Sequence, residues 1–300
     1  MTARPEAPIP RLELANRVCS LAGWDDPFEA YDRLGAEARA ALLDLLPDGW
    51  AFGGRRVLDF GCGAGRTLRH FLDEAERAEV WGVDIDAPSI AWLEENLSPP
   101  LHVMRNGPDP PLGFEHGTFD LIWALSVFTH LTDNSLPWLV ELHSLLKPDG
   151  LLVATYMGRW NADIFTHELW DEDRIGMNVL RRNQAWEHGG PIVLMSDWWM
   201  HAHWGRAFEI LETAPRVHGQ TWTLLRKRDV DVTVANLERP ADDPREYQAL
   251  RHNLRQLERD RELALADLRQ HYEGSRSWRI TRPLRCIAGI GRRLAQRRVP

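Results

Sequence analysis

Two acids and a set of glycines have the residue types and the spacing that a binding site for a charged small molecule needs. In VLDFGCGAGR, Gly61, Gly63 and Gly65 lie two residues apart and follow an apolar run that contains Asp59. Nineteen residues after the last glycine, the run VWGVD ends in Asp84. Glycines let a backbone approach a ligand closely, and a carboxylate at a strand end can accept both hydroxyls of a ribose. The pattern therefore predicts a ribose-bearing ligand that carries a carboxylate of its own.

The glycine spacing separates this turn from a dinucleotide-binding loop. Such a loop has G-x-G-x-x-G, whereas this chain has G-x-G-x-G with an acid two residues before the first glycine. A helix is expected at Thr67–Glu76, and the amide groups at the start of a helix favour a carboxylate as readily as a phosphate. The alternative is a tight turn that binds no ligand.

Strand-like and helix-like segments alternate around these residues. The expected segments are Val57–Phe60, Thr67–Glu76, Glu79–Val83, Pro88–Asn96, Leu101–Arg105, Phe119–Val127, Leu136–Leu146 and Leu151–Tyr156. Such alternation predicts parallel strands that helices cover on both faces. The runs Phe208–Val217 and Thr221–Val230 are joined by a short link and predict an antiparallel hairpin.

Four motifs in this order resemble those of a class I S-adenosylmethionine-dependent methyltransferase of the type 11/12-like group, over roughly residues 25–230. The motifs are VLDFGCGAGR, VWGVDIDAPSI, the loop NGPDPP before FDLIWALSVFTHL, and ELHSLLKPDGLLVATY. The resemblance implies S-adenosylmethionine as the cofactor. It also implies an α/β, Rossmann-like fold with a seven-stranded, mostly parallel sheet that ends in the C-terminal antiparallel hairpin, to which a helical extension is added.

The resemblance further implies which residues contact the cofactor. The expected set is Asp59, Gly61, Cys62, Gly63 and Gly65 at the methionine end, Asp84 at the ribose, Ile85, Asn106 and Gly107 around adenine, and Leu125 and Ser126 after the fourth strand. Many relatives have an aspartate for the adenine amino group where this chain has Asn106-Gly107. Asp86 is expected to cap the next helix, and Arg66 either approaches the cofactor carboxylate or faces solvent.

His130 in SVFTHL is the candidate general base for a hydroxyl acceptor. It follows the fourth strand, at the edge of the sheet where open α/β sheets bind ligands, and it resembles a histidine that many relatives carry there. The alternative is that His130 packs against the following helix or caps it. Trp186, His188 and His201 are candidates for binding the acceptor, with a core tryptophan and surface histidines as the alternatives. No metal site is expected, because three scattered cysteines form no ligand motif.

The chain is expected to have five parts. These are N-terminal helices in residues 1–50, a methyltransferase domain in 51–235 with a Trp-rich insertion at 157–204, a linker at 236–243, a helix at 244–273, and a basic amphipathic tail at 274–300. The helix has imperfect heptads, so it is predicted to be either a homodimer seam or a solvated single helix. The tail contains eight arginines and no acid, which predicts contact with an anionic membrane surface, with disorder as the alternative.

Composition sets the expected cellular context. The chain carries a formal charge of -8 and has no apolar run long enough to span a bilayer, which favours a cytoplasmic protein, peripheral at the inner membrane face. The acidic body and the absence of an Asn-Pro-Pro-Tyr type motif argue against a nucleic-acid substrate.

The tail also bears on the acceptor. Its run SRSWRITRPLR resembles a C-terminal element of bacterial methyltransferases and glycosyltransferases that work on cell-surface polysaccharides. The combined hypothesis is O-methylation of a sugar hydroxyl on a bacterial cell-surface glycan or glycolipid. The alternatives are a soluble small metabolite methylated on oxygen or nitrogen, and a non-catalytic scaffold at the membrane.

Overall fold

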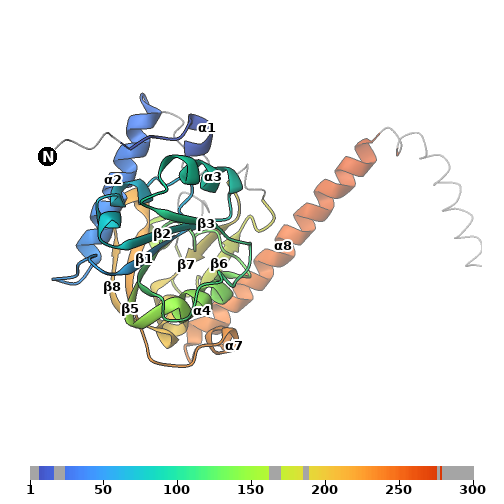
Figure 1. Ribbon diagram of the computed structural model, residues 1–300. Helices are drawn as coiled ribbons and strands as arrows, with labels where there is room; N and C mark the ends of the chain where they lie inside the picture. Colours follow the sequence, from blue (N-terminus) through green and yellow to red (C-terminus); the bar gives the residue numbers. More distant parts are fainter. Residues whose placement is uncertain (1–6, 17–23, 162–169, 185–188, 276–277, 279–300) are drawn as a thin grey trace, which may run out of the picture. The chain divides into compact units, whose positions relative to one another are not determined.

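The computed structural model describes residues 7–16, 24–161, 170–184, 189–275 and 278 of the chain (Figure 1). The chain divides into two compact units, Met1–Leu250 and Arg251–Pro300.

A seven-stranded sheet forms the centre of the first unit. Its strands lie in the order β3-β2-β1-β4-β5-β9-β8. Their bounds are β1 (Arg56–Phe60), β2 (Glu79–Asp84), β3 (His102–Arg105), β4 (Phe119–Ala124), β5 (Leu146–Tyr156), β8 (Phe208–Pro215) and β9 (Thr221–Lys227). Strands β1 to β5 pair in parallel, and β9 pairs antiparallel with both β5 and β8. The predicted α/β fold with its C-terminal hairpin is therefore confirmed.

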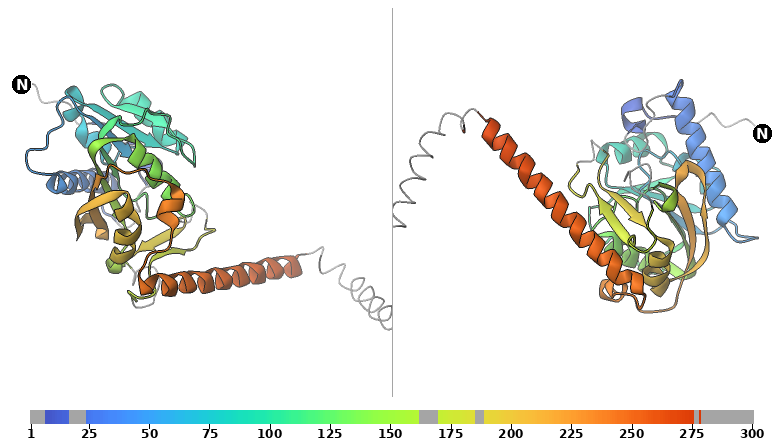
Figure 2. Two further views of the ribbon diagram at one scale, coloured as in Figure 1. Left: turned by 90° about the horizontal axis from the view of Figure 1, so that it is seen from below. Right: turned by 180° about the vertical axis from the view of Figure 1, so that it is seen from behind.

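Helices cover both faces of this sheet (Figure 2). They are α2 (Pro27–Leu45), α3 (Ala87–Asn96), α4 (Ser135–Leu145) and α6 (Asp197–His203), while α1 (Leu12–Ala15) packs on α2 and α7 (Val234–Glu238) packs on α4. Successive strand residues face opposite sides, so Leu58 and Ile122 pack in one core with α4, whereas Val57 and Leu121 pack in another with α2 and α3. Apolar side chains thus cover both faces of the sheet, so a ligand can bind only at the ends of the strands.

Acidic N-caps fix where two of these helices begin. The Asp26 carboxylate accepts hydrogen bonds from the amides of Phe28 and Glu29, and Pro27 occupies the first turn of α2. Asp86 accepts from the Ser89 amide at 3.1 Å, which confirms its prediction as the cap of α3.

The prediction of a helix at Thr67–Glu76 was wrong. The structure has two short 3-10 turns instead, η1 (Leu68–Phe71) and η2 (Glu74–Glu76). Arg69 and Glu74 are buried in ion pairs with Asp32 and Arg39 of α2, so the segment follows α2 and forms no regular helix of its own. A segment this short and irregular has no aligned helix dipole with which to attract an anion.

The Trp-rich insertion contains a second, small sheet. Its elements are β6 (Met177–Leu180) and β7 (Ile192–Met195), which pair antiparallel, followed by α6. Trp198, Trp199 and Trp204 are buried in the core that also holds α4. These three tryptophans therefore fill part of that core.

The long C-terminal helix is α8 (Pro244–Gly274). Its first turns belong to the first unit, because Glu246 is buried and its carboxylate lies 3.0 Å from His203 Nε2. Of the predicted tail, only Gly274, Ser275 and Trp278 fall within the described residues. Among the helices that the structure describes, none has an apolar stretch sufficient to cross a bilayer.

Candidate functional site

The glycine turn joins β1 to η1 at the carboxyl edge of the sheet. Gly61 and Gly65 have φ values of +83° and +80°, in the left-handed region that favours glycine. A Cβ atom at Gly61 would lie 2.3 Å from a methyl carbon of Val127, and one at Gly65 would lie 2.6 Å from a methyl carbon of Leu93. Backbone conformation and close packing therefore both require glycine at these two positions.

The amides of the turn are already engaged within the protein. Those of Gly61 and Cys62 donate to the Val83 carbonyl at 2.8 and 3.0 Å, and that of Gly65 donates to the Cys62 carbonyl at 2.9 Å. The Gly63 amide donates to Asp84 Oδ2 at 2.7 Å. The Cys62 side chain is buried in the core. The turn therefore offers a ligand its bare Cα atoms and carbonyl oxygens, and few donors.

Asp84 is placed to accept two more hydrogen bonds. Besides the Gly63 amide on Oδ2, the Asp86 amide donates to its Oδ1 at 2.8 Å. Each carboxylate oxygen can accept about two hydrogen bonds, so each retains capacity for one hydroxyl. Burial raises the pKa of Asp84 and the negative charge of Asp86 adds to the rise, whereas the backbone amides of Asp86, Gly63 and Ile85 oppose it. This geometry suits the vicinal hydroxyls of a ribose.

Asp59 lies beneath the turn as a buried carboxyl group. Burial raises its pKa to about 7, and the negative charge of Asp84 adds to the rise, whereas the positive charge of Arg66 opposes it. A cationic group bound nearby would favour the ionised form. Asp59 is therefore a carboxyl group whose charge responds to the ligand.

The residues expected around adenine lie together at the ends of two neighbouring strands. The register pairs Asp84 with Arg105, so Ile85 and Asn106 follow at the same edge. Ile85 is 49% exposed, as an apolar surface for a ring requires. The Asn106 amide group donates to the Gly107 carbonyl at 2.7 Å, and amide oxygens can accept from an amino group.

Ser126 lies in a constrained turn after β4. Its φ is +59°, its amide donates to Thr155 Oγ1 at 2.7 Å, and its hydroxyl accepts from Gln220 at 2.6 Å. Leu125 is partly buried and packs on the core beside α2. Ser126 is near the glycine turn, because Val127 contacts Gly61.

His130 is held in one tautomer by a carbonyl oxygen. Its Nδ1 lies 2.7 Å from the Pro191 carbonyl, which can only accept, so Nδ1 carries the proton. Burial lowers the pKa of His130, and the bond to Pro191 opposes the decrease. A neutral imidazole of this tautomer presents Nε2 as the basic atom.

Of the three candidates for binding the acceptor, only His201 lies within the described residues. His201 is exposed on α6, and no contact within the described part of the chain joins it to the glycine turn. Trp186 and His188 lie outside the described residues.

The sequence interpretation missed two residues that tie distant segments to this edge. Tyr31 of α2 donates from its hydroxyl to the Ala64 carbonyl at 3.0 Å, inside the glycine turn. Gln220 reaches Ser126 from the link between β8 and β9. Neither residue has a local sequence signal, since each contact joins segments more than 30 residues apart.

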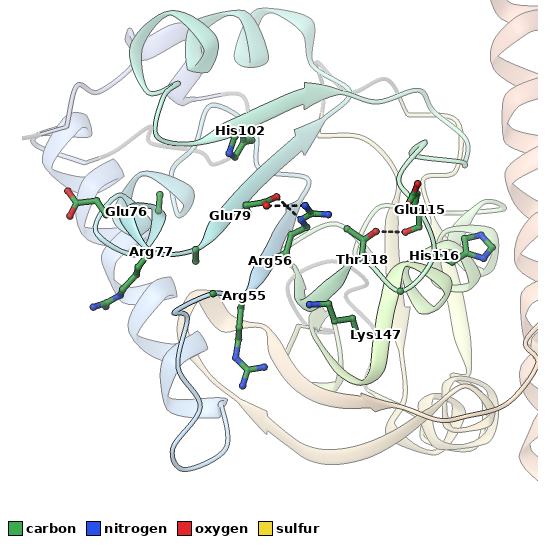
Figure 3. A pocket seen from close by; sticks show the side chains of 14 residues that line it. Arg55, Arg56, Glu76, Arg77, Glu79, His102, Glu115, His116, Thr118 and Lys147 are labelled. Atoms are coloured by element: carbon green, nitrogen blue, oxygen red, sulfur yellow. Dashed lines mark hydrogen bonds and ion pairs between the residues drawn. The ribbon is translucent and has the colours of Figure 1, made fainter.

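A large pocket lies at the opposite edge of the sheet. It has a volume of about 740 Å³ and is lined by residues at the amino ends of the strands, among them Arg56, Glu79, His102 and Lys147 (Figure 3). Arg56 and Glu79 form an ion pair there. Open parallel sheets bind ligands at the carboxyl ends of their strands, so this pocket is not the candidate site.

Parts of the chain resemble known proteins in sequence and in fold. Residues 58–152 match the family model of a methyltransferase domain. The chain is 29% identical to 2-methyl-6-phytyl-1,4-hydroquinone methyltransferase of Synechocystis sp., over 64% of this chain and 54% of that protein. It is 34% identical to tRNA U34 carboxymethyltransferase of Idiomarina loihiensis, over 33% of this chain and 32% of that protein. The chain thus spans about half or less of the length of these relatives.

A solved structure shows the same fold. The PH0226 protein of Pyrococcus horikoshii superposes with a TM-score of 0.50 at 16% identity, over 71% of this chain and 96% of that one. Residues 58–152 thus match a methyltransferase domain, and the comparisons indicate that the cofactor of this class is S-adenosylmethionine. The site fits this molecule at the ribose, because both Asp84 oxygens keep acceptor capacity for hydroxyl groups.

The pKa of Asp59 leads to a prediction for stability. In the folded protein the carboxyl group loses its proton near pH 7, and in the unfolded chain near 3.8. Between these values the folded state holds a proton that the unfolded state lacks, so the contribution of Asp59 to the free energy of unfolding falls as pH rises. Asp59→Asn should therefore be more stable than wild type at pH 8, by on the order of 2–4 kcal/mol, and the gain should shrink toward pH 5.

Urea denaturation without cofactor measures this difference. Asp48→Asn, at an exposed position, is the control and should change stability by less than about 0.5 kcal/mol. A stability difference between Asp59→Asn and wild type that is the same at pH 5 and pH 8 would show that Asp59 is not a buried titrating group.

Proposed function

We propose that the protein is an S-adenosylmethionine-dependent enzyme that methylates a sugar hydroxyl of a bacterial cell-surface glycan or glycolipid. The observation that carries the proposal of O-methylation is the tautomer of His130, whose Nδ1–H donates to the Pro191 carbonyl. A hydroxyl needs a base to become a good nucleophile, and a neutral imidazole at the carboxyl edge is suited to that role.

The chain's own residues perform two tasks in this mechanism. Asp84 and the glycine turn hold the adenosyl group, and His130 Nε2 accepts the proton of the acceptor hydroxyl as the oxygen attacks. S-adenosylmethionine, when bound, supplies an activated methyl group on its sulfonium. Alignment of the acceptor provides most of the rate acceleration.

An exposed indole near the same edge supports a sugar as the acceptor. Trp160 lies four residues beyond the end of β5 and is 66% exposed. A flat aromatic face can stack on the apolar face of a sugar ring, while its exposure to water costs free energy in the absence of a partner. The resemblance of the tail to those of polysaccharide enzymes supports the same substrate class.

Labelled cofactor identifies the acceptor class directly. The protein is incubated with S-adenosylmethionine labelled in its methyl group and with separate bacterial fractions of polysaccharide, glycolipid, quinone and tRNA. We expect label in the polysaccharide or glycolipid fraction, in a methyl ether that survives alkali. Label confined to quinone or tRNA would contradict the proposal, and no transfer to any fraction would favour a non-catalytic scaffold.

His130→Gln tests the proposed base. Glutamine keeps a donor for the Pro191 carbonyl but has no basic nitrogen, so kcat should fall by about 100-fold or more. The affinity for S-adenosylhomocysteine should stay within about twofold, because His130 does not hold the cofactor. His116→Gln, at the amino edge of the sheet, is the matched control. A kcat that is equal for His130→Gln and wild type would remove His130 as the base.

The pH profile gives a second measurement of His130. Burial lowers its pKa below 6.5, so the imidazole stays neutral as pH falls to that value. Activity of the wild type should therefore persist at pH 6.5 and decline only below it. The residual activity of His130→Gln should lack this decline.

The C-terminal region supports a membrane-side dimer in this proposal. Exposed apolar side chains lie along one stripe of α8: Tyr247, Leu250, Leu254, Leu257, Leu265 and Leu268. Residues 244–273 carry six arginines and six acids, and a narrow stripe on a charge-balanced helix is typical of a coiled-coil seam. We assign the stripe to a second copy of α8 and the basic tail to anionic lipid.

Sedimentation tests membrane binding by the tail and dimerisation through α8 separately. With vesicles that contain phosphatidylglycerol, the full chain should co-sediment and a chain truncated after Glu273 should not; equal recovery of both would contradict membrane binding by the tail. Without vesicles, the truncated chain should sediment as a dimer, and Leu254→Glu should make it a monomer. A monomeric truncated chain would contradict the seam.

A further inference from the structure

The first turn of α8 carries a buried acid that pairs with a buried histidine. Glu246 and His203 are 6% and 2% exposed, and His203 Nε2 lies 3.0 Å from Glu246 Oε2. The other imidazole nitrogen, Nδ1, lies 2.7 Å from the Leu237 carbonyl, which can only accept, so Nδ1 carries a proton. A second proton must therefore lie between Nε2 and the carboxyl group. Neither side chain takes part in the mechanism proposed above.

A buried pair of this kind fixes geometry more than it adds stability. Removing ionisable groups from water is costly, and well-packed apolar residues in their place often give equal or higher stability. A hydrogen bond nevertheless restricts the distance and the angle between its two partners. The pair of Glu246 and His203 therefore fixes how the first turn of α8 lies on the end of α6.

Two further contacts join the start of α8 to the Trp-rich insertion. The Arg245 guanidinium lies over the Trp198 ring, 5.0 Å from its centre. Ala249 is buried in the same core as α6. A Cβ atom at Gly176 would lie 3.2 Å from the Ala249 Cβ and 2.8 Å from a ring carbon of Trp199. The insertion therefore packs directly against the first turns of α8.

Aromatic rings connect this region to the turn that carries His130. The Trp199 ring stacks on His203, with 4.4 Å between ring centres and 18° between ring planes. Trp204 follows His203 and packs on Phe128 with 4.6 Å between ring centres, and both of these side chains are fully buried. Phe128 lies two residues before His130. Side-chain contacts therefore extend from the first turn of α8 to the turn of the proposed base.

The insertion also supplies the carbonyl group that orients the base. Pro191, which accepts from the His130 imidazole, directly precedes β7, and β7 leads into α6. The strands β6 and β7 form a sheet of their own, separate from the seven-stranded sheet. The Val193 amide donates to the Thr129 carbonyl at 2.8 Å. The position of the Pro191 carbonyl therefore depends on how β7 and α6 are held.

We propose that Glu246 is a positioning residue, which holds α6 through His203 and thereby fixes both the turn and the carbonyl group that orient His130. The start of the C-terminal helix is then part of the active-site architecture, and displacement of this first turn alters the base. The proposal deepens the function proposed above and rests on the role of His130 in it.

Three variants separate this contact from the stability of the fold. Glu246→Met has nearly the same size but leaves His203 Nε2 without a partner. Glu246→Gln can donate from its amide group to Nε2, so it keeps the contact. Glu258→Met, at an exposed position of α8, is the matched control.

Nuclear magnetic resonance of protein with ¹⁵N-labelled histidine reports the tautomer of His130, whose signals are assigned with His130→Gln. Wild type, Glu246→Gln and Glu258→Met should show a single tautomer that is protonated on Nδ1. Glu246→Met should show His130 in exchange between two tautomers, because the Pro191 carbonyl no longer holds one position. This measurement needs no acceptor.

Turnover gives the second readout. With the bacterial fraction that accepts the methyl label, kcat of Glu246→Met should fall by about 10- to 100-fold, as expected for a misaligned reacting group. Its affinity for S-adenosylhomocysteine, measured by calorimetry, should stay within about twofold of wild type. Gly176→Ala leaves the Glu246 pair unchanged but presses on Trp199, so it should alter the His130 signals in the same way.

The outcomes distinguish this proposal from the proposed function. If the His130 signals and kcat of Glu246→Met equal those of wild type, the inference is overturned. An equal loss of turnover and of affinity for S-adenosylhomocysteine would also overturn it, because the substitution would then damage the whole domain. If His130 of the wild type carries its proton on Nε2, or if no fraction accepts the label, the proposed function itself is contradicted.

Discussion

The hydrogen bond from the Gly63 amide to Asp84 Oδ2, at 2.7 Å, joins the two halves of the candidate site. It links the turn after β1 to the end of β2, which are the two parts of the site that we propose contact the amino acid and the ribose of the cofactor. The amides of Gly61 and Cys62 reinforce this link through the Val83 carbonyl, one residue earlier on β2. The same bond also fixes the orientation of the Asp84 carboxylate, whose two oxygens can each accept one more hydrogen bond.

Segments that are distant in the sequence also contact the turns of the candidate site. Helix α2 reaches the turn through Tyr31 and Gly35, and the link between β8 and β9 reaches Ser126 through Gln220. The glycine turn and the turn at Ser126 are therefore contacted by segments from the beginning and the end of the domain. A substitution in either segment can alter cofactor binding without touching a glycine.

The sequence predicted those features that arise from local patterns. The alternation of apolar runs and amphipathic segments predicted the sheet, and Asp86 before Ala-Pro-Ser predicted the cap of α3, because both depend on near neighbours in the chain. The helix predicted at Thr67–Glu76 was wrong, because Arg69 and Glu74 pair with residues of α2 that lie 35 or more positions away. Burial of Asp59 and the tautomer of His130 likewise come from tertiary packing, so no local motif could show them.

The most direct test of the account is a crystal structure of the protein with S-adenosylhomocysteine. We expect both ribose hydroxyls within about 3 Å of the two Asp84 oxygens, with the Gly63 amide still bonded to the same carboxylate. A ligand bound instead in the pocket at the amino edge, or an Asp84 carboxylate that contacts no ribose oxygen, would contradict the central claim.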